Sequence, residues 1–407
     1  MTTPPSLANE SWLTAEPVQR LLTLLSAGDG EARIAGGAVR NALLGEPIAD
    51  IDIATTLPPW RVTELVTRAG MSVHATGLAH GTVTVVVHEA DETHAFEVTT
   101  LRVDTETDGR RAKVAFTDDW VADASRRDFT INAMFCDANG TVHDPLGGYD
   151  DLVARTVRFA GDPDARITED YLRILRFFRF HARYGTGEMD AAALKACTKH
   201  KKALSNLSGE RVRTEILKLL VARNVIETIA VMDRHGIFQC AFPAELRLKP
   251  LEQMRDIDAA NGLPSDGELR LCVLVDPRKA PIDRLRLSNE QRDRILAVPA
   301  DTSLSPRLRD SERKIVLYQM GADGYRDAVR CRWALSGDAI DDAGWLALLC
   351  LPGDWPVPVF PVKGRDLINR GVTPGPELGD KLQALEDWWM AAGFPDDRNE
   401  ILSQLQV

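Results

Sequence analysis

The chain has only six cysteines, and no two of them form a Cys-x-x-Cys pair. They are scattered along the sequence at Cys136, Cys197, Cys240, Cys272, Cys331 and Cys350. This scatter argues against a disulfide framework or a zinc site, and it indicates reduced thiols in a cytoplasmic protein. The eight histidines show no metal-ligand spacing either.

Long apolar runs, an N-terminal signal segment and internal repeats are also missing. No run approaches the roughly 18 apolar residues that a membrane-spanning helix needs. The chain begins with a polar, proline-rich segment, MTTPPSLANE. We therefore expect a cytoplasmic protein with no membrane partner. Its 407 residues, 44% of them hydrophobic, suffice for roughly two to four domains with proper cores.

A general excess of positive charge is lacking, since the formal net charge is −11. Residues 161–220 are an exception, with 12 Lys and Arg against 8 Asp and Glu, a local net charge of +4. A basic region confined to one part of an acidic chain favours a single nucleotide or nucleic-acid site over indiscriminate binding to polyanions.

A glycine pair predicts a phosphate-binding loop. Gly36 and Gly37 precede a short run of helix-forming residues, 38–44, which Gly45 ends. Glycine lets backbone N–H groups approach an anion closely, and the positive end of the following helix points the same way. A glycine pair alone is more often an ordinary turn, so this interpretation depends on its neighbours.

Two aspartates follow shortly after this helix. In the expected strand 50–54, Asp50 and Asp52 project from one face, because alternate side chains point to the same side. Their carboxylates repel each other unless a cation lies between them, and magnesium takes carboxylate and phosphate oxygens together. An isolated Asp-x-Asp is usually solvated, but the succession of loop, helix and strand indicates phosphoryl or nucleotidyl transfer.

The next elements supply a third carboxylate. A helix is expected over 58–69, and period-two patterns predict strands over 72–75, 82–88 and 95–100. Glu97 would stand on the polar side of the last strand, where it could complete a metal site or orient an attacking hydroxyl. The alternative is a solvated strand glutamate.

Two further segments complete the first part of the chain. Residues 104–119 are polar, charged and without period, and they predict a mobile loop. If residues 126–133 are helical, Asp128 and Asn132 share a face next to Arg127. An arginine for phosphate with Asp and Asn for sugar hydroxyls would suit a nucleoside triphosphate; a surface arginine pair on a capped helix is the simpler alternative.

From about residue 150 the pattern is helical almost to the end, and an expected helix over 168–183 is the most informative. An acidic and three basic residues recur at every third position on one face, namely Asp170, Arg173, Arg176 and Arg179. An Asp and an Arg so spaced present an acceptor and a fork of donors, which can recognise a base edge. A surface ion pair is the alternative. However, the segment 168–183 interleaves four arginines, the fourth at position 183, with three phenylalanines, and this favours a site.

Taken in order, these motifs resemble those of the class II tRNA nucleotidyltransferase and bacterial poly(A) polymerase family. The resemblance is carried by GGAVR, LLG, DIDIAT, FEVTTLR, DGRRAKVAF, RRDFTINAM, DPLGGYDDL and EDYLRILRFFRFHARYG. It is specific over residues 30–220 and weaker beyond, where GRDLINRGVTPGPELGDKL resembles the family's C-terminal region.

The resemblance implies an α+β fold: a polymerase-β-like nucleotidyltransferase head, with a small mixed sheet and helices, followed by an all-α neck, body and tail. We expect the catalytic head over 1–149 and a neck that recognises the base over 150–222. A helical body over 223–300 and a tRNA-binding tail over 301–407 would follow.

The resemblance also implies roles for individual residues. Asp50 and Asp52 would bind Mg2+, with Glu97 as the third catalytic carboxylate. The implied nucleotide-binding residues are Gly36, Gly37, Arg40, Arg127, Asp128, Asn132, Asp170, Arg173, Arg176 and Arg179. Among them, Asp170 and Arg173 would form a protein template that pairs with the edge of cytosine or adenine.

Two other positions stand out in this resemblance. Residues 208–212, SGERV, resemble the motif that braces the helical region. Asn41 stands where the family usually has Asp, so this position keeps its hydrogen bonding but loses a charge. We expect a local structural change there.

The implied reaction is two-metal addition of C, C and A to the 3′ end of tRNA from CTP and ATP, with release of pyrophosphate. A poly(A) polymerase on the same head and a catalytically inactive RNA-binding module are the alternatives, the latter disfavoured because Asp50 and Asp52 are both present. Residues 331–407 carry 6 Lys and Arg against 12 Asp and Glu, whereas poly(A) polymerases of the family tend to have a basic C-terminal extension. The family's CC-only enzymes lack the flexible loop that DGRRAKVAF keeps, so we expect full CCA addition.

Overall fold

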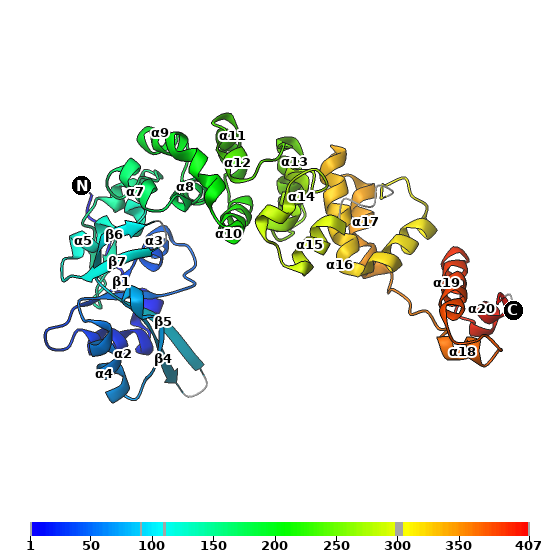
Figure 1. Ribbon diagram of the computed structural model, residues 1–407, viewed down its shortest axis with the longest axis horizontal. Helices are drawn as coiled ribbons and strands as arrows, with labels where there is room; N and C mark the ends of the chain where they lie inside the picture. Colours follow the sequence, from blue (N-terminus) through cyan, green and yellow to red (C-terminus); the bar gives the residue numbers. More distant parts are fainter. Residues whose placement is uncertain (1, 90–91, 109–110, 298–303, 406–407) are drawn as a thin grey trace. The chain divides into compact units, whose positions relative to one another are not determined.

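The computed structural model describes residues 2–89, 92–108, 111–297 and 304–405. The chain forms two compact units, Met1–Pro243 and Ala244–Val407. The first contains a mixed sheet with helices and the second is helical (Figure 1), as the predicted α+β architecture requires. The first unit continues past residue 222, and the finer division into head, neck, body and tail stays a prediction.

A seven-stranded sheet forms the base of the first unit, in the order β3-β4-β5-β2-β1-β8-β9. All neighbouring strands are antiparallel except β2 and β5, which are parallel. The strands are β1 (Ala32–Ala35), β2 (Asp52–Thr55), β3 (Ser72–Gly77), β4 (Thr82–Glu89), β5 (Glu92–Thr100), β8 (Phe135–Cys136) and β9 (Val142–His143). The three strands predicted between residues 72 and 100 are confirmed.

Four helices belong to the N-terminal part of this unit: α1 (Ser11–Thr14), α2 (Glu16–Leu25), α3 (Gly37–Leu44) and α4 (Pro59–Arg68). α2 and α4 contact each other and pack on β1, β3 and β4 (Figure 1). Each has a proline in its first turn, where the missing N–H costs nothing. α3 ends at Gly45, whose φ of +66° is the usual left-handed helix end. The helices predicted over 38–44 and 58–69 are thereby confirmed.

The prediction of a mobile loop over 104–119 is wrong for the residues that the structure describes. They form an antiparallel hairpin of β6 (Arg102–Asp108) and β7 (Arg111–Phe116), followed by α5 (Trp120–Ser125); residues 109 and 110 lie outside the described part. Although the segment is polar, β-branched residues stand at alternate positions, at Val103, Thr105 and Thr107, and this pattern favours a strand.

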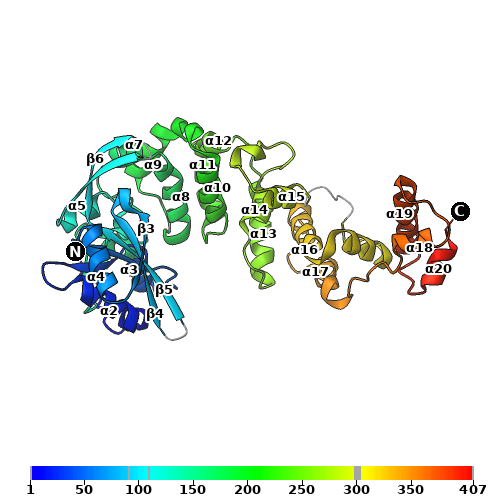
Figure 2. The ribbon, with the colours of Figure 1, turned by 60° about the horizontal axis from the view of Figure 1, so that its bottom comes forward.

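The rest of the first unit is mainly helical, as predicted. Its helices are α6 (Gly148–Val153), α7 (Pro163–Glu169), α8 (Leu172–Tyr184), α9 (Ala191–His200), α10 (Gly209–Leu220), α11 (Val225–Arg234) and α12 (Ile237–Ala241). Short 3-10 turns are η1 (Leu78–His80), η2 (Thr130–Asn132) and η3 (Lys201–Asn206). Figure 2 shows α8 and α10 side by side.

An aromatic cluster joins α8 to the segment before the sheet's last two strands. Phe129 lies 5.1 Å from Phe159 and 4.9 Å from Phe180 between ring centroids, and Phe177 stacks on Phe159 at 5.7 Å. Phe129, Phe159 and Phe177 are at most 1% exposed. Because such packing is dense, the cluster fixes α8 relative to the sheet.

The second unit consists of helices α13 (Leu248–Ala260), α14 (Gly267–Leu274), η4 (Ile282–Leu285), α15 (Asn289–Ala297), α16 (Asp310–Ser336), α17 (Ala343–Asp354), α18 (Gly364–Ile368), α19 (Pro376–Ala391) and α20 (Arg398–Ser403). Gly321, with φ of +70°, kinks α16. In its core Asp258, 2% exposed, pairs with Arg270 and Arg330. None of the described helices is both long and apolar enough to cross a membrane.

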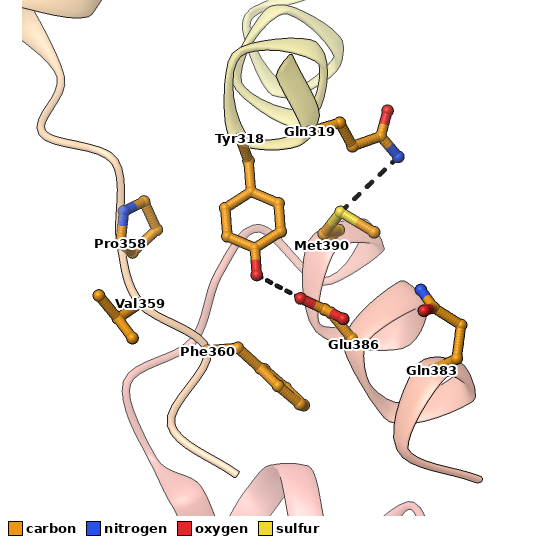
Figure 3. Close-up of a pocket in the computed structure, with 8 residues that line it drawn as sticks. All are labelled: Tyr318, Gln319, Pro358, Val359, Phe360, Gln383, Glu386 and Met390. Atoms are coloured by element: carbon orange, nitrogen blue, oxygen red, sulfur yellow. Dashed lines mark hydrogen bonds between the residues drawn. The ribbon is translucent and has the colours of Figure 1, made fainter. Parts of the chain in front are cut away.

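A hollow in this unit lies between α16, α19 and residues 358–360 (Figure 3). Tyr318 extends from α16 toward Glu386 of α19 and donates a hydrogen bond to its carboxylate. Burial, together with this acidic partner, raises the pKa of Tyr318 to about 12. None of the eight lining residues is basic, so the hollow is unsuited to phosphate.

Candidate active site

Two carboxylates lie side by side at the beginning of β2, and a third closely precedes the strand in sequence. β2 begins at Asp52, so the prediction that Asp50 belongs to the same strand is wrong. The reason is that the neighbouring strand β1 ends at Ala35, opposite Asp52, so the pairing of the two strands ends there. β2 runs parallel to β5, and the register sets Asp52 directly beside Glu97. Asp50, Asp52 and Glu97 are all exposed. The sheet therefore adds a carboxylate from a separate strand to the two aspartates.

The electrostatics of these carboxylates favour a cation. Partial burial raises the pKa of Asp52, and the negative charges of Glu97 and Asp50 raise it further. The positive charge of Arg127 opposes this shift. Within the described ranges, no three acidic, histidine or cysteine side chains converge as a complete metal site. The carboxylates instead form an open set of oxygens, which fits a hard divalent ion that completes its shell with substrate oxygens and water.

The glycine pair forms the turn between β1 and α3. Gly36 has a φ of +68°, which favours glycine, and its N–H donates to the carbonyl of Met134. A Cβ at Gly36 would lie 3.1 Å from Nη1 of Arg127 and 3.4 Å from the carbonyl oxygen of Asn132. The absence of a side chain therefore lets Arg127 approach the loop that begins α3.

A buried aspartate, Asp123 of α5, holds the neighbouring arginines. Its side chain is 1% exposed and accepts hydrogen bonds from Arg126 Nε at 2.7 Å and Arg127 Nη2 at 3.0 Å. Burial alone would raise the pKa of Asp123, but the charges of Arg127 and Arg126 hold it below its ordinary value. The Arg127 guanidinium also lies over the Phe135 ring, 4.9 Å from its centroid. Asp123 thus fixes Arg127 beside the glycine loop.

Asp128 and Asn132 meet although residues 126–133 do not form the helix that was considered for them. Only the short turn η2 forms, because Phe129 makes a β-bridge with Phe159 that a continuous helix would break. Asn132 Nδ2 nevertheless donates to Asp128 Oδ1 at 2.9 Å. The other carboxylate oxygen of Asp128 accepts from Arg176 Nε at 2.9 Å. The pair is therefore tied to α8.

Asp170 and Arg173 lie at the start of α8, so the prediction of one helix over 168–183 is wrong. Asp170 is extended (φ −153°, ψ 105°) because its Oδ1 accepts the N–H of Leu172 at 3.1 Å, which starts a new helix. Its Oδ2 accepts a hydrogen bond from Arg211 at 2.6 Å. Arg173 pairs with Glu169. The two expected template residues are thus each fixed by another side chain and do not pair with each other.

Arg176 and Arg179 converge on Glu215 of α10. Arg179 Nε donates to its carboxylate at 2.5 Å, and Arg176 Nη1 lies 3.9 Å from it. Glu215 is 5% exposed. Burial alone would lower the pKa of Arg176, but its ion pairs with Asp128 and Glu215 raise it. These arginines therefore connect the Asp128 segment, α8 and α10 in one network.

Arg40 projects from α3 into a buried junction with α8. It is 7% exposed and donates hydrogen bonds to Asn41, Asn132 and Tyr184. Its guanidinium also lies 4.2 Å from the centroid of the Tyr184 ring. The expected contact of Arg40 with the triphosphate stays a prediction. Its hydrogen bond to Tyr184 links α3, which follows the glycine loop, to α8.

Four partners of these residues were not predicted: Asp123, Glu169, Tyr184 and Glu215. Two of them carried a local signal, since Asp123 precedes Arg127 by four residues and Glu169 precedes Arg173 by four. Tyr184 and Glu215 reach partners distant in sequence or on another helix, so only the tertiary structure could reveal them. Arg211 belongs to the motif that was expected to brace the helix, and it does contact Asp170.

The Asp128 pair predicts a pH-dependent stability. Burial alone would raise the pKa of Asp128, but the charge of Arg176 and the hydrogen bonds hold it below the ordinary 3.8. The carboxylate therefore stabilises the fold fully above pH 3.8, and this contribution is lost as the pH falls through the lower folded-state pKa. Asp128→Asn should cost about 3 kcal/mol near neutral pH and progressively less in acid.

Urea unfolding of the wild type and variant, between about pH 2 and pH 6, measures this difference. Asp118→Asn, which alters an exposed aspartate of the same region, is the control. It should leave the loss of unfolding free energy at acid pH unchanged. A difference between wild type and Asp128→Asn that stays constant with pH would contradict the assignment of the ion pair.

Two family models match the chain. The model described as "Poly A polymerase head domain" matches residues 32–158, and "Probable RNA and SrmB- binding site of polymerase A" matches residues 188–245. CCA tRNA nucleotidyltransferase 1, mitochondrial, of Homo sapiens is 35% identical over 399 residues, 97% of this chain and 91% of that protein. The CCA-adding enzyme of Limosilactobacillus fermentum is 31% identical over 95% of both chains.

Solved structures agree with these matches. The CCA-adding enzyme of Bacillus stearothermophilus in complex with CTP has a TM-score of 0.71 and 25% identity, covering 92% of both chains. The Thermotoga maritima CCA-adding enzyme complexed with tRNA shares the fold at a TM-score of 0.64 and 19% identity, covering 100% of both chains. The head is therefore polymerase-β-like, as predicted. The chain belongs to the family of class II CCA-adding tRNA nucleotidyltransferases and bacterial poly(A) polymerases.

Proposed function

We propose that this chain is a CCA-adding tRNA nucleotidyltransferase, which adds C, C and A to the 3′ end of tRNA from CTP and ATP and releases pyrophosphate. One observation carries the chemistry: Asp52 and Glu97 lie side by side in register, and the charge of Arg127 reaches Asp52. An oxygen-rich metal site next to a phosphate site is what nucleotidyl transfer requires.

The choice of CCA addition within the family is supported by the relatives. The proteins of Homo sapiens and Limosilactobacillus fermentum are named for this activity and match over nearly their whole length. The acidic C-terminal region, with 12 acidic against 6 basic residues over 331–407, supports the same choice.

Asp50, Asp52 and Glu97 are the residues that would hold Mg2+. The raised pKa of Asp52 supports this assignment, since its causes, burial first and then the charges of Glu97 and Asp50, disfavour an ionised carboxylate that a cation would stabilise. When bound, the ion supplies Lewis-acid activation of the 3′-hydroxyl of the RNA and neutralises charge on the leaving pyrophosphate. The carboxylates would hold this ion, and Glu97 would complete the site or orient the attacking hydroxyl.

The glycine loop and Arg127 bind the triphosphate in this proposal. The N–H of Gly36 is bonded to the Met134 carbonyl, so the backbone donors are those of Gly37 and the residues after it at the start of α3; Arg127 is held next to this loop by Asp123. Asp128 and Asn132, already hydrogen-bonded to each other, hold the ribose hydroxyls. Since these groups are fixed before the nucleotide arrives, little conformational freedom is lost on binding.

Base selection is assigned to the start of α8. Asp170 supplies carboxylate oxygens and Arg173 supplies guanidinium donors, and Arg211 and Glu169 hold them in orientation. Arg176 and Arg179 contact the nucleotide beside them. A fixed acceptor and donor set favours bases with a complementary Watson–Crick edge, which suits cytosine and adenine.

A reducing compartment, and more narrowly the cytoplasm, is the location that we propose. The six cysteines are free thiols, which supports a reducing environment. The relatives of Mus musculus and Homo sapiens are named as mitochondrial proteins.

The proposal predicts a defined order of nucleotide addition. A tRNA ending at the discriminator base, incubated with the protein and magnesium, should gain two residues with CTP alone and a third only when ATP is also present. Extension resolved to single nucleotides on a sequencing gel measures this. A long ladder with ATP alone would identify a poly(A) polymerase, and no extension under any mixture would favour an RNA-binding module.

The template assignment predicts a loss of nucleotide choice. Asp170→Ala or Arg173→Ala should change the CTP to ATP ratio of kcat/KM by about tenfold or more, because each removes one side of a paired recognition element. Steady-state extension of tRNA lacking CCA measures the ratio. Lys195→Ala, at an exposed lysine of α9, is the control, and an unchanged preference in both template variants would remove the claim.

A further inference from the structure

Arg40 is a buried cation whose hydrogen-bond acceptors are all neutral. Its Nε and Nη2 donate to Asn41 Oδ1 at 3.1 and 2.8 Å, and Nη2 also donates to the Tyr184 hydroxyl at 2.7 Å. Nη1 donates to the amide oxygen of Asn132. The guanidinium is therefore well hydrogen-bonded, but these bonds leave its charge in place.

The carboxylates near Arg40 are engaged elsewhere. Among the side chains that the structure describes, no carboxylate lies within 4.0 Å of its guanidinium. Asp128 and Glu46 contribute opposite charge from a distance, but Asp128 pairs with Arg176, and Glu46 lies 3.6 Å from Arg183. Burial lowers the pKa of Arg40, as expected for a cation that lacks a counter-ion.

The side chain of Asn41 has a fixed orientation. Its Oδ1 accepts from Arg40, and its Nδ2 donates to the carbonyl of Pro47 at 2.8 Å. Arginine offers only donors and a carbonyl only an acceptor, so the amide cannot be reversed. Pro47 lies in the segment that leads from α3 to Asp50. Asn41 thus links the cation to the chain that carries a predicted metal ligand.

The charge lies next to the predicted phosphate loop. A Cβ added at Gly37 would be 3.7 Å from Nη2 of Arg40. An aspartate at position 41 would neutralise this cation, and it would also set a carboxylate oxygen without a proton against the Pro47 carbonyl. A neutral amide satisfies both neighbours and leaves the positive charge available to an anion.

We propose that Asn41 is a positioning residue that leaves the charge of Arg40 uncompensated until the triphosphate of a nucleotide binds at the Gly37 loop. The inference rests on the proposed function and identifies a determinant of its nucleotide affinity. Because Arg40 also donates to Tyr184 of α8, an anion that compensates it stabilises the contact between the loop and this helix.

Inorganic pyrophosphate tests this without base recognition. Its affinity for the full chain, with magnesium and without tRNA, is measured by calorimetry for the wild type, Asn41→Ala and Asn41→Asp. Both variants lose the donor to Pro47, but only Asn41→Asp adds a negative charge next to Arg40. Pyrophosphate should bind about tenfold more weakly to Asn41→Asp than to Asn41→Ala.

The same two substitutions in an Arg40→Gln background complete the cycle, and there they should bind pyrophosphate equally. Equal binding in the Arg40 background, or an undiminished difference in the Arg40→Gln background, would overturn the inference. Thermal unfolding shows whether Asn41→Asp is folded. If it is not, Arg40→Gln alone decides: it should weaken the binding of pyrophosphate about tenfold. Wild-type affinity in this variant would overturn the inference.

The proposed function fails separately from this inference. A wild type that binds neither pyrophosphate nor CTP and extends no tRNA would overturn the proposed function and the inference with it. A wild type that binds and extends, with equal affinities for Asn41→Ala and Asn41→Asp, would overturn the inference alone.

Discussion

Repulsion between neighbouring carboxylates is the constraint on which the rest of the site depends. The parallel register of β2 and β5 puts Asp52 beside Glu97, and Asp50 adds a third negative charge to the pair. Three like charges close together are unfavourable unless cations balance them. The glycine loop and Arg127 lie near these carboxylates. A substrate that brings both phosphates and a divalent ion would need such an arrangement.

A second set of charges joins the loop that would hold the triphosphate to the helices that would select the base. Asp128 pairs with Arg176, and Glu215 receives Arg176 and Arg179 from α8. The carboxylates of Asp128 and Glu215 are 11% and 6% exposed, so removing their arginine partners leaves an uncompensated charge, which costs more than at an exposed pair. The network therefore fixes the Asp128 segment relative to α8 and α10, so that a change at one end affects the other.

Local patterns predicted much of this, because they depend on neighbours in sequence. The strands between residues 72 and 100, α3 with its Gly45 end and α4 with its first-turn proline follow from periodicity and caps. The misses have different causes: one is a tertiary contact, and the others are local features that the patterns did not show. The bridge of Phe129 to Phe159 replaced a helix, and the cap by Asp170 divided another. The register that brings Glu97 to Asp52, and partners such as Glu215, are non-local and could not be derived from spacing.

The most direct test of the account is Asp52→Asn, measured for nucleotide addition and for thermal unfolding on the same preparation. The raised pKa of Asp52 means that its ionised form destabilises the metal-free fold at neutral pH. The account therefore predicts that the variant adds no nucleotide to tRNA and unfolds, without metal, at a temperature equal to or above that of the wild type. Retained addition, or lost addition accompanied by a lower unfolding temperature, would contradict the claim that this carboxylate serves the reaction at the expense of stability.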